Sequence, residues 1–301
     1  MRVTLPTTEL LEALRPLVPG DVQLELWDWA APVAGPVDLA VLPYMAPASV
    51  LGVLAGSQVR AVQSQSLGFD NMDEHLPAGI ILSNAVGVHQ GVTGELAAAL
   101  VLSGLRDLPR SVDQQRASVW EQYWTPGLLG RTVLVLGVGG VGAAVADRLR
   151  PFEVDMVRAA SRARDDEHGH IHGTDELPQL VAEADVIVIG LPLTDQTRGL
   201  FDEHLIGTMK PGALLVNVGR GAIVDTDALV AACAAGRIIA ALDVMDPEPL
   251  PAEHPLWTTP GVMIVPHLGG RTTSMDARVQ KLVADQVNRL VAGEALAHRV
   301  L

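Results

Sequence analysis

Short runs of apolar residues recur along the chain and are separated by polar or glycine-rich segments. In the middle and C-terminal parts these runs are continuously apolar, which is typical of strands buried on both faces of a parallel sheet. The pattern predicts strands over Thr132–Leu136, Val154–Ala159, Val186–Gly190, Leu214–Val218, Ile238–Val244 and Met263–Val265. A helix or loop precedes each run, and this alternation indicates right-handed crossovers within a parallel sheet.

The N-terminal part has a similar pattern with shorter strands. We expect strands over Val3–Leu5, Val22–Trp27, Leu39–Leu42 and Val59–Gln63, and helices over Glu9–Leu17, Gly94–Leu105 and Ser274–Leu290. The last of these has its apolar residues at helical spacing, which indicates an amphipathic helix closing the chain. The sequence therefore predicts two doubly wound α/β domains, residues 1–90 with 271–301 and residues 91–270, the second inserted into the first.

Composition and charge narrow the function classes. The chain has 301 residues, 49% of them hydrophobic, and a formal net charge of −14. Such an acidic surface repels nucleic acid and anionic membranes, so neither is an expected partner. It also repels an anionic substrate at long range, so a site for an acid needs its own fixed Arg or Lys.

The single cysteine, Cys233, lies in an alanine-rich helical stretch and is expected to be a small buried side chain. One cysteine leaves no partner for an intrachain disulfide, which fits a reducing compartment. No apolar run approaches the roughly 18 residues that a membrane span needs. A cytoplasmic protein is the default expectation.

A glycine-rich turn joins the predicted strand Thr132–Leu136 to an apolar helix. Its residues are Gly137, Val138, Gly139, Gly140, Val141 and Gly142, a G-x-G-x-x-G run. The first glycine permits the tight turn, the second lets the backbone approach a pyrophosphate, and the third lets helix and strand pack closely. The free N–H groups of the helix N-terminus suit the phosphates. The turn therefore predicts a bound dinucleotide.

The end of the next strand bears on which dinucleotide is preferred. NAD-preferring sites usually have Asp or Glu there, bonded to the ribose 2′-hydroxyl. This chain has Ser161 and Arg162 instead, with Arg164 close behind. Each charge-assisted bond to a 2′-phosphate is worth about 1.5–3 kcal/mol. We therefore expect NADP(H) to be favoured, with NAD(H) also possible.

Three further segments, each just after a predicted strand, carry candidate catalytic side chains. They place Arg220 after one strand, Asp243 and Glu248 after the next, and His267 after the last. Ligands of open parallel sheets bind outside the carboxyl ends of the strands. A guanidinium suits a carboxylate, and a histidine held by a carboxylate can donate a proton to a carbonyl oxygen. Taken singly, Arg220 would be a strand-end salt bridge and His267 a buried polar residue.

Together these motifs resemble the D-isomer-specific 2-hydroxyacid dehydrogenases. The likeness runs from Ser66–Asn71 through the glycine turn, Leu191–Thr194 and Met209–Gly212 to His267. It implies a Rossmann domain inserted into a flavodoxin-like substrate domain, a homodimer with Gly94–Leu105 near its interface, and hydride transfer between NAD(P)H and a small 2-oxo acid such as glyoxylate or hydroxypyruvate.

The resemblance also implies roles for individual residues. Arg220 would bind the substrate, and His267, paired with Glu248, would be the general acid and base. Glu248 favours a hydroxy acid, because the related formate dehydrogenases have Gln there. Backbone N–H groups at Leu67 and Gly68 would hold the carboxylate, and Asp243 would bond near the nicotinamide. Further cofactor contacts would come from Leu191, Pro192, Thr197, Val218 and Gly269.

Other interpretations stay open. One alternative is a dinucleotide-sensing binding protein on the same scaffold, like the corepressors that resemble these enzymes. Another is a reductase of non-acid carbonyls, which would leave Arg220 without a role. His168, His170 and His172 alternate in a polar stretch, which we interpret as a solvated loop without metal. The aromatic residues Trp120, Tyr123 and Trp124 are expected to cover a hydrophobic surface.

Overall fold

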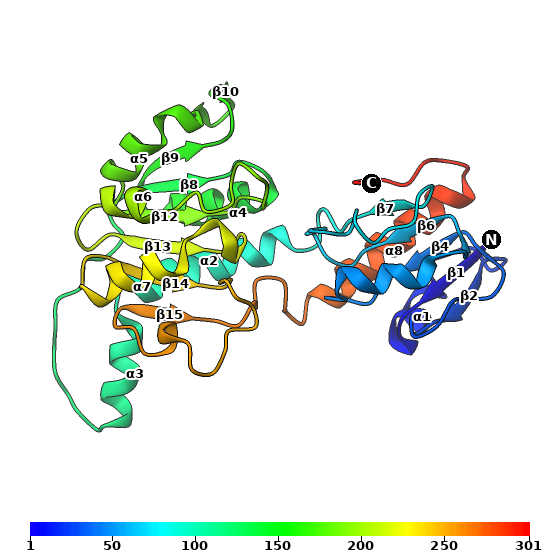
Figure 1. Ribbon diagram of the computed structural model, residues 1–301, viewed down its shortest axis with the longest axis horizontal. Helices are drawn as coiled ribbons and strands as arrows, with labels where there is room; N and C mark the ends of the chain where they lie inside the picture. Colours follow the sequence, from blue (N-terminus) through cyan, green and yellow to red (C-terminus); the bar gives the residue numbers. More distant parts are fainter. The chain divides into compact units, whose positions relative to one another are not determined.

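The computed structural model describes all 301 residues and divides into two compact units. The first unit consists of Met1–His89 and Thr272–Leu301, and the second consists of Gln90–Arg271. Each unit is built around its own parallel sheet (Figure 1). No helix in either unit is both long and apolar enough to cross a membrane.

The first unit has a five-stranded parallel sheet in the order β2-β1-β4-β6-β7. The strands are β1 (Arg2–Leu5), β2 (Gln23–Leu26), β4 (Leu39–Val41), β6 (Ala61–Gln63) and β7 (Ile81–Ser83). This is the strand order of a flavodoxin-like fold. A separate parallel pair joins β3 (Pro36–Val37) to β5 (Gln58–Val59), so the predicted strand Val59–Gln63 is in fact split at Arg60.

Helices cover both faces of this first sheet. Buried side chains of α1 (Thr8–Leu14) and α8 (Met275–Val291) pack on one face, and those of η1 (Ala48–Leu54) pack on the other. The amphipathic stripe of α8 explains its place, because Val279, Val283 and Val287 are all buried against β1 and β4. The C-terminal helix thereby completes the core that the first strands begin.

The second unit has a six-stranded parallel sheet in the order β15-β14-β13-β12-β8-β9. Its strands are β8 (Thr132–Leu136), β9 (Asp155–Ala159), β12 (Val186–Ile189), β13 (Leu214–Asn217), β14 (Ile239–Leu242) and β15 (Val262–Ile264). The chain runs from β8 outward to β9 and then returns to β12 on the other side of β8. The strand order therefore reverses between β8 and β12, the position where Rossmann folds bind dinucleotides.

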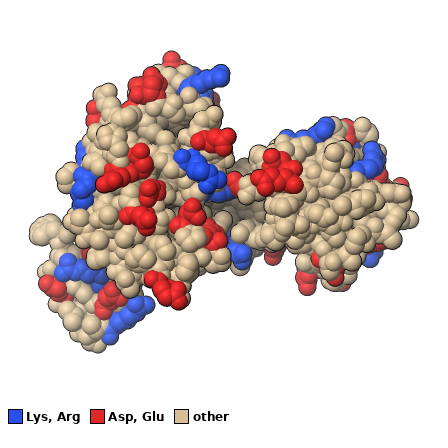
Figure 2. Space-filling view, in the orientation of Figure 1, with Lys and Arg blue, Asp and Glu red and all other residues tan.

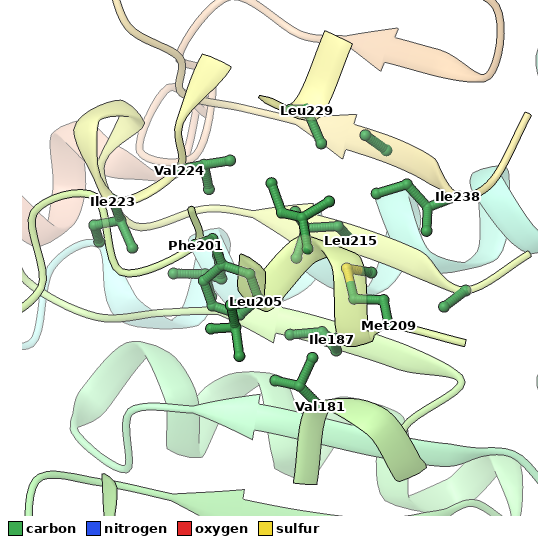
Figure 3. Packing of buried hydrophobic residues seen from close by; sticks show 14 of the residues in the cluster. Val181, Ile187, Phe201, Leu205, Met209, Leu215, Ile223, Val224, Leu229 and Ile238 are labelled. Atoms are coloured by element: carbon green, nitrogen blue, oxygen red, sulfur yellow. The ribbon is translucent and has the colours of Figure 1, made fainter. Parts of the chain in front are cut away.

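Both faces of this second sheet are covered, as its continuously apolar strands predict. Leu134 and Leu136 join a core with α5 (Leu177–Glu183), α6 (Glu203–Thr208) and α7 (Thr226–Ala234), part of which is drawn in Figure 3. Val133 and Val135 point to the other face, which α2 (Gln90–Leu105) and α4 (Gly140–Leu149) cover. The predicted class, a Rossmann domain inserted into a flavodoxin-like one, is confirmed. Cys233 is buried in the core, and burial raises the pKa of its thiol to about 11.

The histidine-rich stretch is exposed to solvent, as the sequence predicts, but it is not a loop. It forms an antiparallel hairpin of β10 (Arg164–Asp166) and β11 (Gly169–Ile171), followed by η3 (Thr174–Glu176). Arg158 on β9 is only 7% exposed, and its side chain holds this hairpin because it donates to both carboxylate oxygens of Asp166 at 2.7 Å. Remaining short helices are η2 (Arg150–Phe152), η4 (Gly221–Ile223) and η5 (Pro255–Trp257).

The aromatic segment after α2 also differs from its prediction. Helix α3 (Leu108–Arg116) and the following loop extend from the body of the second unit (Figure 1). Trp120 is 94% exposed and Trp124 is 101% exposed, so neither covers a hydrophobic surface of this chain. Only Tyr123 is held, by contacts of its hydroxyl with Ser111 and Asp107.

Candidate active site

The glycine turn after β8 is tight at two positions and open at a third. Gly137 has φ +96°, and a Cβ there would lie 2.8 Å from the carbonyl oxygen of Gly190 at the end of β12. A Cβ on Gly142 would lie 1.7 Å from the carbonyl oxygen of Gly137. At Gly139 a Cβ would meet nothing within 4 Å. The turn therefore needs glycine for its own packing at Gly137 and Gly142, and leaves open space beside Gly139.

This arrangement fits a dinucleotide. Gly139 precedes the first turn of α4, where Gly140 and Val141 present backbone N–H groups at the helix N-terminus. No side chain caps these groups, and the helix dipole favours an anion there. The open space beside Gly139 lets a pyrophosphate come close to the backbone. The residues that would hold it are Gly137, Gly139, Gly140, Val141 and Gly142.

The other predicted cofactor residues follow strands of the same sheet. Ser161 and Arg162 are exposed just after β9. After β12, the Thr197 hydroxyl donates to the carbonyl oxygen of Pro192 at 2.7 Å and accepts from the Thr194 N–H at 2.8 Å, which closes the loop that Leu191 begins. Val218, just after β13, is 6% exposed.

The loops after β14 and β15 bring His267 and Glu248 together. The Nδ1 atom of His267 hydrogen-bonds with Oε1 of Glu248. Both side chains are partly exposed, at 32% for His267 and 36% for Glu248. This pairing fixes the orientation of the imidazole and leaves its Nε2 out of the pair.

Asp243 holds the loop that carries His267. Its side chain is buried, and its carboxylate oxygens accept the backbone N–H groups of Leu268 at 2.6 Å and Gly269 at 3.0 Å. Burial raises the pKa of Asp243, although these two hydrogen bonds and the nearby His267 lower it in part. A Cβ on Gly269 would lie 2.7 Å from this carboxylate, so the contact depends on glycine.

Arg220 begins the loop after β13. Its guanidinium donates to the carbonyl oxygen of Gly219 at 2.7 Å. The backbone of this loop is set by Asn217, a 1% exposed residue whose amide donates to the Arg220 carbonyl at 2.9 Å and accepts from the Gly219 N–H at 3.0 Å. Asn217 is a positioning residue that the motif analysis missed. Its signal is a polar side chain at the end of an apolar strand.

The three loops that carry Arg220, Glu248 and His267 leave the same edge of the sheet, because β13, β14 and β15 are parallel neighbours. The first two loops are in close contact, since a Cβ on Gly221 would lie 2.0 Å from the Met245 carbonyl oxygen. The glycine turn lies at the same edge. The second unit thus places a guanidinium, a carboxylate–imidazole pair and a dinucleotide turn at one edge of one sheet.

Leu67 and Gly68 belong to the first unit and are half-buried there. The Asn84 side chain, only 4% exposed, donates to the Leu67 carbonyl oxygen at 2.7 Å. The Ala85 N–H donates to the carbonyl oxygen of Ser66 at 3.0 Å. These two bonds fix the turn after β6, and Asn84 is a second positioning residue that sequence reasoning missed.

Comparison with known proteins identifies the family. A family model described as the NAD-binding domain of D-isomer specific 2-hydroxyacid dehydrogenases matches residues 98–269. A glyoxylate reductase/hydroxypyruvate reductase of Mus musculus is 35% identical over 253 residues, which cover 80% of this chain and 77% of the relative. This chain belongs to the D-isomer-specific 2-hydroxyacid dehydrogenase family. It is therefore an NAD(P)-dependent oxidoreductase of small 2-hydroxy or 2-oxo acids.

Solved dehydrogenases of this family share the architecture. A family protein from Aeromonas salmonicida matches with a TM-score of 0.89 and 27% identity, covering 100% of this chain and 98% of that one. A D-isomer specific 2-hydroxyacid dehydrogenase from Xanthobacter autotrophicus, solved with NADPH and MES, matches with a TM-score of 0.82 and 27% identity, covering 100% and 97%. Both units of this dehydrogenase thus have counterparts in family structures.

Proposed function

We propose that this dehydrogenase reduces a small 2-oxo acid to a D-2-hydroxy acid, with NADPH as the preferred hydride donor and His267 as the general acid. The observation that carries the proposal is the hydrogen bond between His267 and Glu248 at the edge of the sheet where Arg220 and the glycine turn also lie. A dinucleotide-binding turn alone would suit many proteins. A carboxylate-held imidazole and a guanidinium carried by loops at the same end of one sheet suit acid–base chemistry on an acid.

Each residue has a defined task. A dinucleotide held at the glycine turn would supply a hydride for the carbonyl carbon of the 2-oxo acid. Nε2 of His267 gives its proton to the carbonyl oxygen, while Glu248 orients the ring through Nδ1 and stabilises the imidazolium. The Arg220 guanidinium binds the substrate carboxylate and polarises the carbonyl. In the oxidation direction, His267 takes the proton back from the hydroxyl.

Glyoxylate and hydroxypyruvate are the proposed substrates. The Mus musculus relative carries the name glyoxylate reductase/hydroxypyruvate reductase. The chain has a formal net charge of −14, so a small anionic substrate needs the fixed cation that Arg220 provides. Backbone N–H groups at Leu67 and Gly68, in the turn that Asn84 holds, would bind the carboxylate from the first unit.

The proposed preference for NADPH depends on Ser161 and Arg162. These residues follow β9, where NAD-specific folds carry a carboxylate for the ribose hydroxyls. Both side chains are exposed, and a guanidinium and a hydroxyl there suit a 2′-phosphate. The Xanthobacter autotrophicus relative was solved with NADPH.

We further propose a homodimer. The segment from Leu108 to Leu129 exposes Trp120 and Trp124 almost completely, together with Val119 and Leu129. Exposed apolar side chains gathered on one projecting segment mark an association surface. Figure 2 shows acidic and basic side chains interspersed around this projection, at the lower left of the view. A second copy of this chain would cover the tryptophans. Sedimentation of the wild type and of a Trp120→Ser/Trp124→Ser variant tests this proposal.

A panel of 2-oxo acids tests the proposed reaction. NADPH oxidation is followed by its absorbance with glyoxylate, hydroxypyruvate, pyruvate and larger 2-oxo acids, and with non-acid aldehydes as controls. The proposal expects turnover with one or more small 2-oxo acids and none with the aldehydes. Tight NADPH binding without any turnover would contradict it and favour a dinucleotide-sensing protein instead.

A further inference from the structure

Three metal-ligating side chains that have no part in the proposed reaction lie together beside the end of β9. They are His170, His172 and Glu176, and one ligand atom from each lies within 4.8 Å of the others. The two imidazole rings are 4.7 Å apart and nearly perpendicular. His170 is exposed and the other two are half-buried, so an ion in solution can reach all three.

The hairpin fixes where the two histidines point. Residues two apart on a strand share a face, so His170 on β11 and His172 just after it lie on one side. The end of this strand is bound to β9, because the His172 N–H donates to the Arg158 carbonyl at 2.8 Å and the Ala160 N–H donates to the His172 carbonyl at 3.0 Å. Two main-chain hydrogen bonds therefore hold His172 against the central sheet.

Neighbouring carboxylates orient the ligands further. Asp165 lies opposite His170 in the hairpin, and its carboxylate hydrogen-bonds with Nδ1 of His170 at 2.8 Å. This leaves Nε2 of His170 to act as the ligand atom, as in carboxylate–histidine–metal arrangements. Glu176 accepts the Gly173 N–H with one oxygen at 3.1 Å and lies 2.7 Å from Nδ1 of His172 with the other.

We propose that His170, His172 and Glu176 form a binding site for a divalent late first-row transition metal, with Zn²⁺ as the representative ion. Two imidazoles and one carboxylate form a ligand set that zinc uses, and water would complete the tetrahedron. Mg²⁺ and Ca²⁺ prefer oxygen ligands, so a site with two imidazole nitrogens suits neither ion. Ligand atoms around tetrahedral zinc lie about 3.3 Å apart, so small rotations of these accessible side chains suffice to close the site. This proposal differs from our prediction that the stretch binds no metal.

Titration calorimetry of the full chain with Zn²⁺ tests the site. We expect one site per chain in the wild type, and a loss of affinity of about 10-fold or more in each of His170→Ala, His172→Ala and Glu176→Gln. Asp165→Asn, which removes the carboxylate partner of His170, should weaken binding by roughly 10–100-fold. The matched control is His168→Ala, because His168 lies two residues away but contacts Glu167 and Arg150 instead.

The chain has nine histidines in all, and a second readout separates the two in this site from the others. Co²⁺ bound in a four-coordinate site gives visible absorption bands, and we expect these bands in wild type and His168→Ala but not in a His170→Ala/His172→Ala variant. Thermal melting of each variant without metal checks that the fold is kept. Equal Zn²⁺ affinity in wild type and the double variant, or an equal loss in His168→Ala, would overturn the proposal.

Discussion

The backbone N–H of His267 donates to the carbonyl oxygen of Asp243 at 2.9 Å, and the Asp243 carboxylate binds the N–H groups of the next two residues. His267 itself has φ +52°, a left-handed conformation that a residue with a Cβ adopts only at a cost of about 1–3 kcal/mol. One buried aspartate therefore holds the loop in the conformation that brings His267 to Glu248. We conclude that Asp243 is a positioning residue for the imidazole.

Replacing Asp243 by Asn tests this conclusion. An amide retains one acceptor oxygen but turns an NH₂ group toward the second backbone N–H, so one hydrogen bond is lost inside the protein. We expect the free energy of unfolding to fall by about 1–3 kcal/mol and kcat to fall with it. Asp246→Asn is the matched control, because Asp246 is exposed in the same loop. Unchanged thermal melting of Asp243→Asn would show that the carboxylate does not anchor the loop.

Two glycines of the turn allow an effect on protein packing to be distinguished from an effect on cofactor binding. In Gly142→Ala the new Cβ would lie 1.7 Å from the Gly137 carbonyl oxygen, so we expect a loss of stability of about 1–3 kcal/mol and weaker cofactor binding. In Gly139→Ala the Cβ meets nothing within 4 Å of the protein, so stability should stay and only cofactor affinity should fall. Melting curves and NADPH titrations measure both. Full NADPH affinity in Gly139→Ala would contradict the proposed position of the pyrophosphate.

Arg162→Ala tests the cofactor preference. Loss of one charge-assisted hydrogen bond to the 2′-phosphate should lower kcat/KM for NADPH about 10- to 100-fold. The value for NADH should change little, because NADH has no 2′-phosphate, and it serves as the internal control. An equal fall with both cofactors, or a wild-type preference for NADH, would show that Arg162 does not read the phosphate.

Asp185 lies at the end of the sheet opposite to the proposed active site, and it should make the stability of the protein depend on pH. Burial alone would raise the pKa of Asp185, but the Thr132 N–H at 2.9 Å, Lys210 at 3.2 Å and Arg131 together lower it below its ordinary value. A carboxyl with a lowered pKa in the folded state stabilises the protein above the ordinary pKa, and this contribution is lost as the pH falls through the folded-state pKa.

Asp185→Asn should therefore melt at a lower temperature than wild type at pH 7, with the difference shrinking on acidification below about pH 4. Its kcat should stay within about twofold of wild type, because the residue is remote from the catalytic loops in the strand direction. A melting difference that grows toward low pH would contradict the direction of the pKa shift.

Much of the second unit is readable from sequence because its signals are local. An apolar strand, a glycine turn and a helix follow one another within residues 132–149, and the same residues form β8, the turn and α4. The loops that carry Arg220, Glu248 and His267 are equally readable, since each begins where a continuous apolar run ends. Parallel neighbouring strands then bring their carboxyl ends to one edge without any further information.

What sequence reasoning missed depends on contacts between distant residues. The β10–β11 hairpin has no apolar period. It is tied to the sheet in part by the buried Arg158 side chain, which binds the exposed carboxylate of Asp166, and no spacing rule signals this pair. The three-residue strand β7 was also missed; it is defined by its pairing with β6. The side-chain amides of Asn84 and Asn217 donate hydrogen bonds to backbone carbonyl oxygens of nearby turns, so the roles of these residues emerge only from the folded geometry.

The most direct measurement of the central claim is the single-turnover rate of NADPH oxidation with glyoxylate or hydroxypyruvate in wild type, His267→Ala and His204→Ala. His204 is an exposed histidine on α6 and serves as the matched control. If His267 donates the proton, its loss should slow the step about 10²- to 10⁴-fold and leave NADPH affinity within about threefold, while His204→Ala reacts like wild type. A His267→Ala rate within about threefold of wild type would contradict the proposed mechanism.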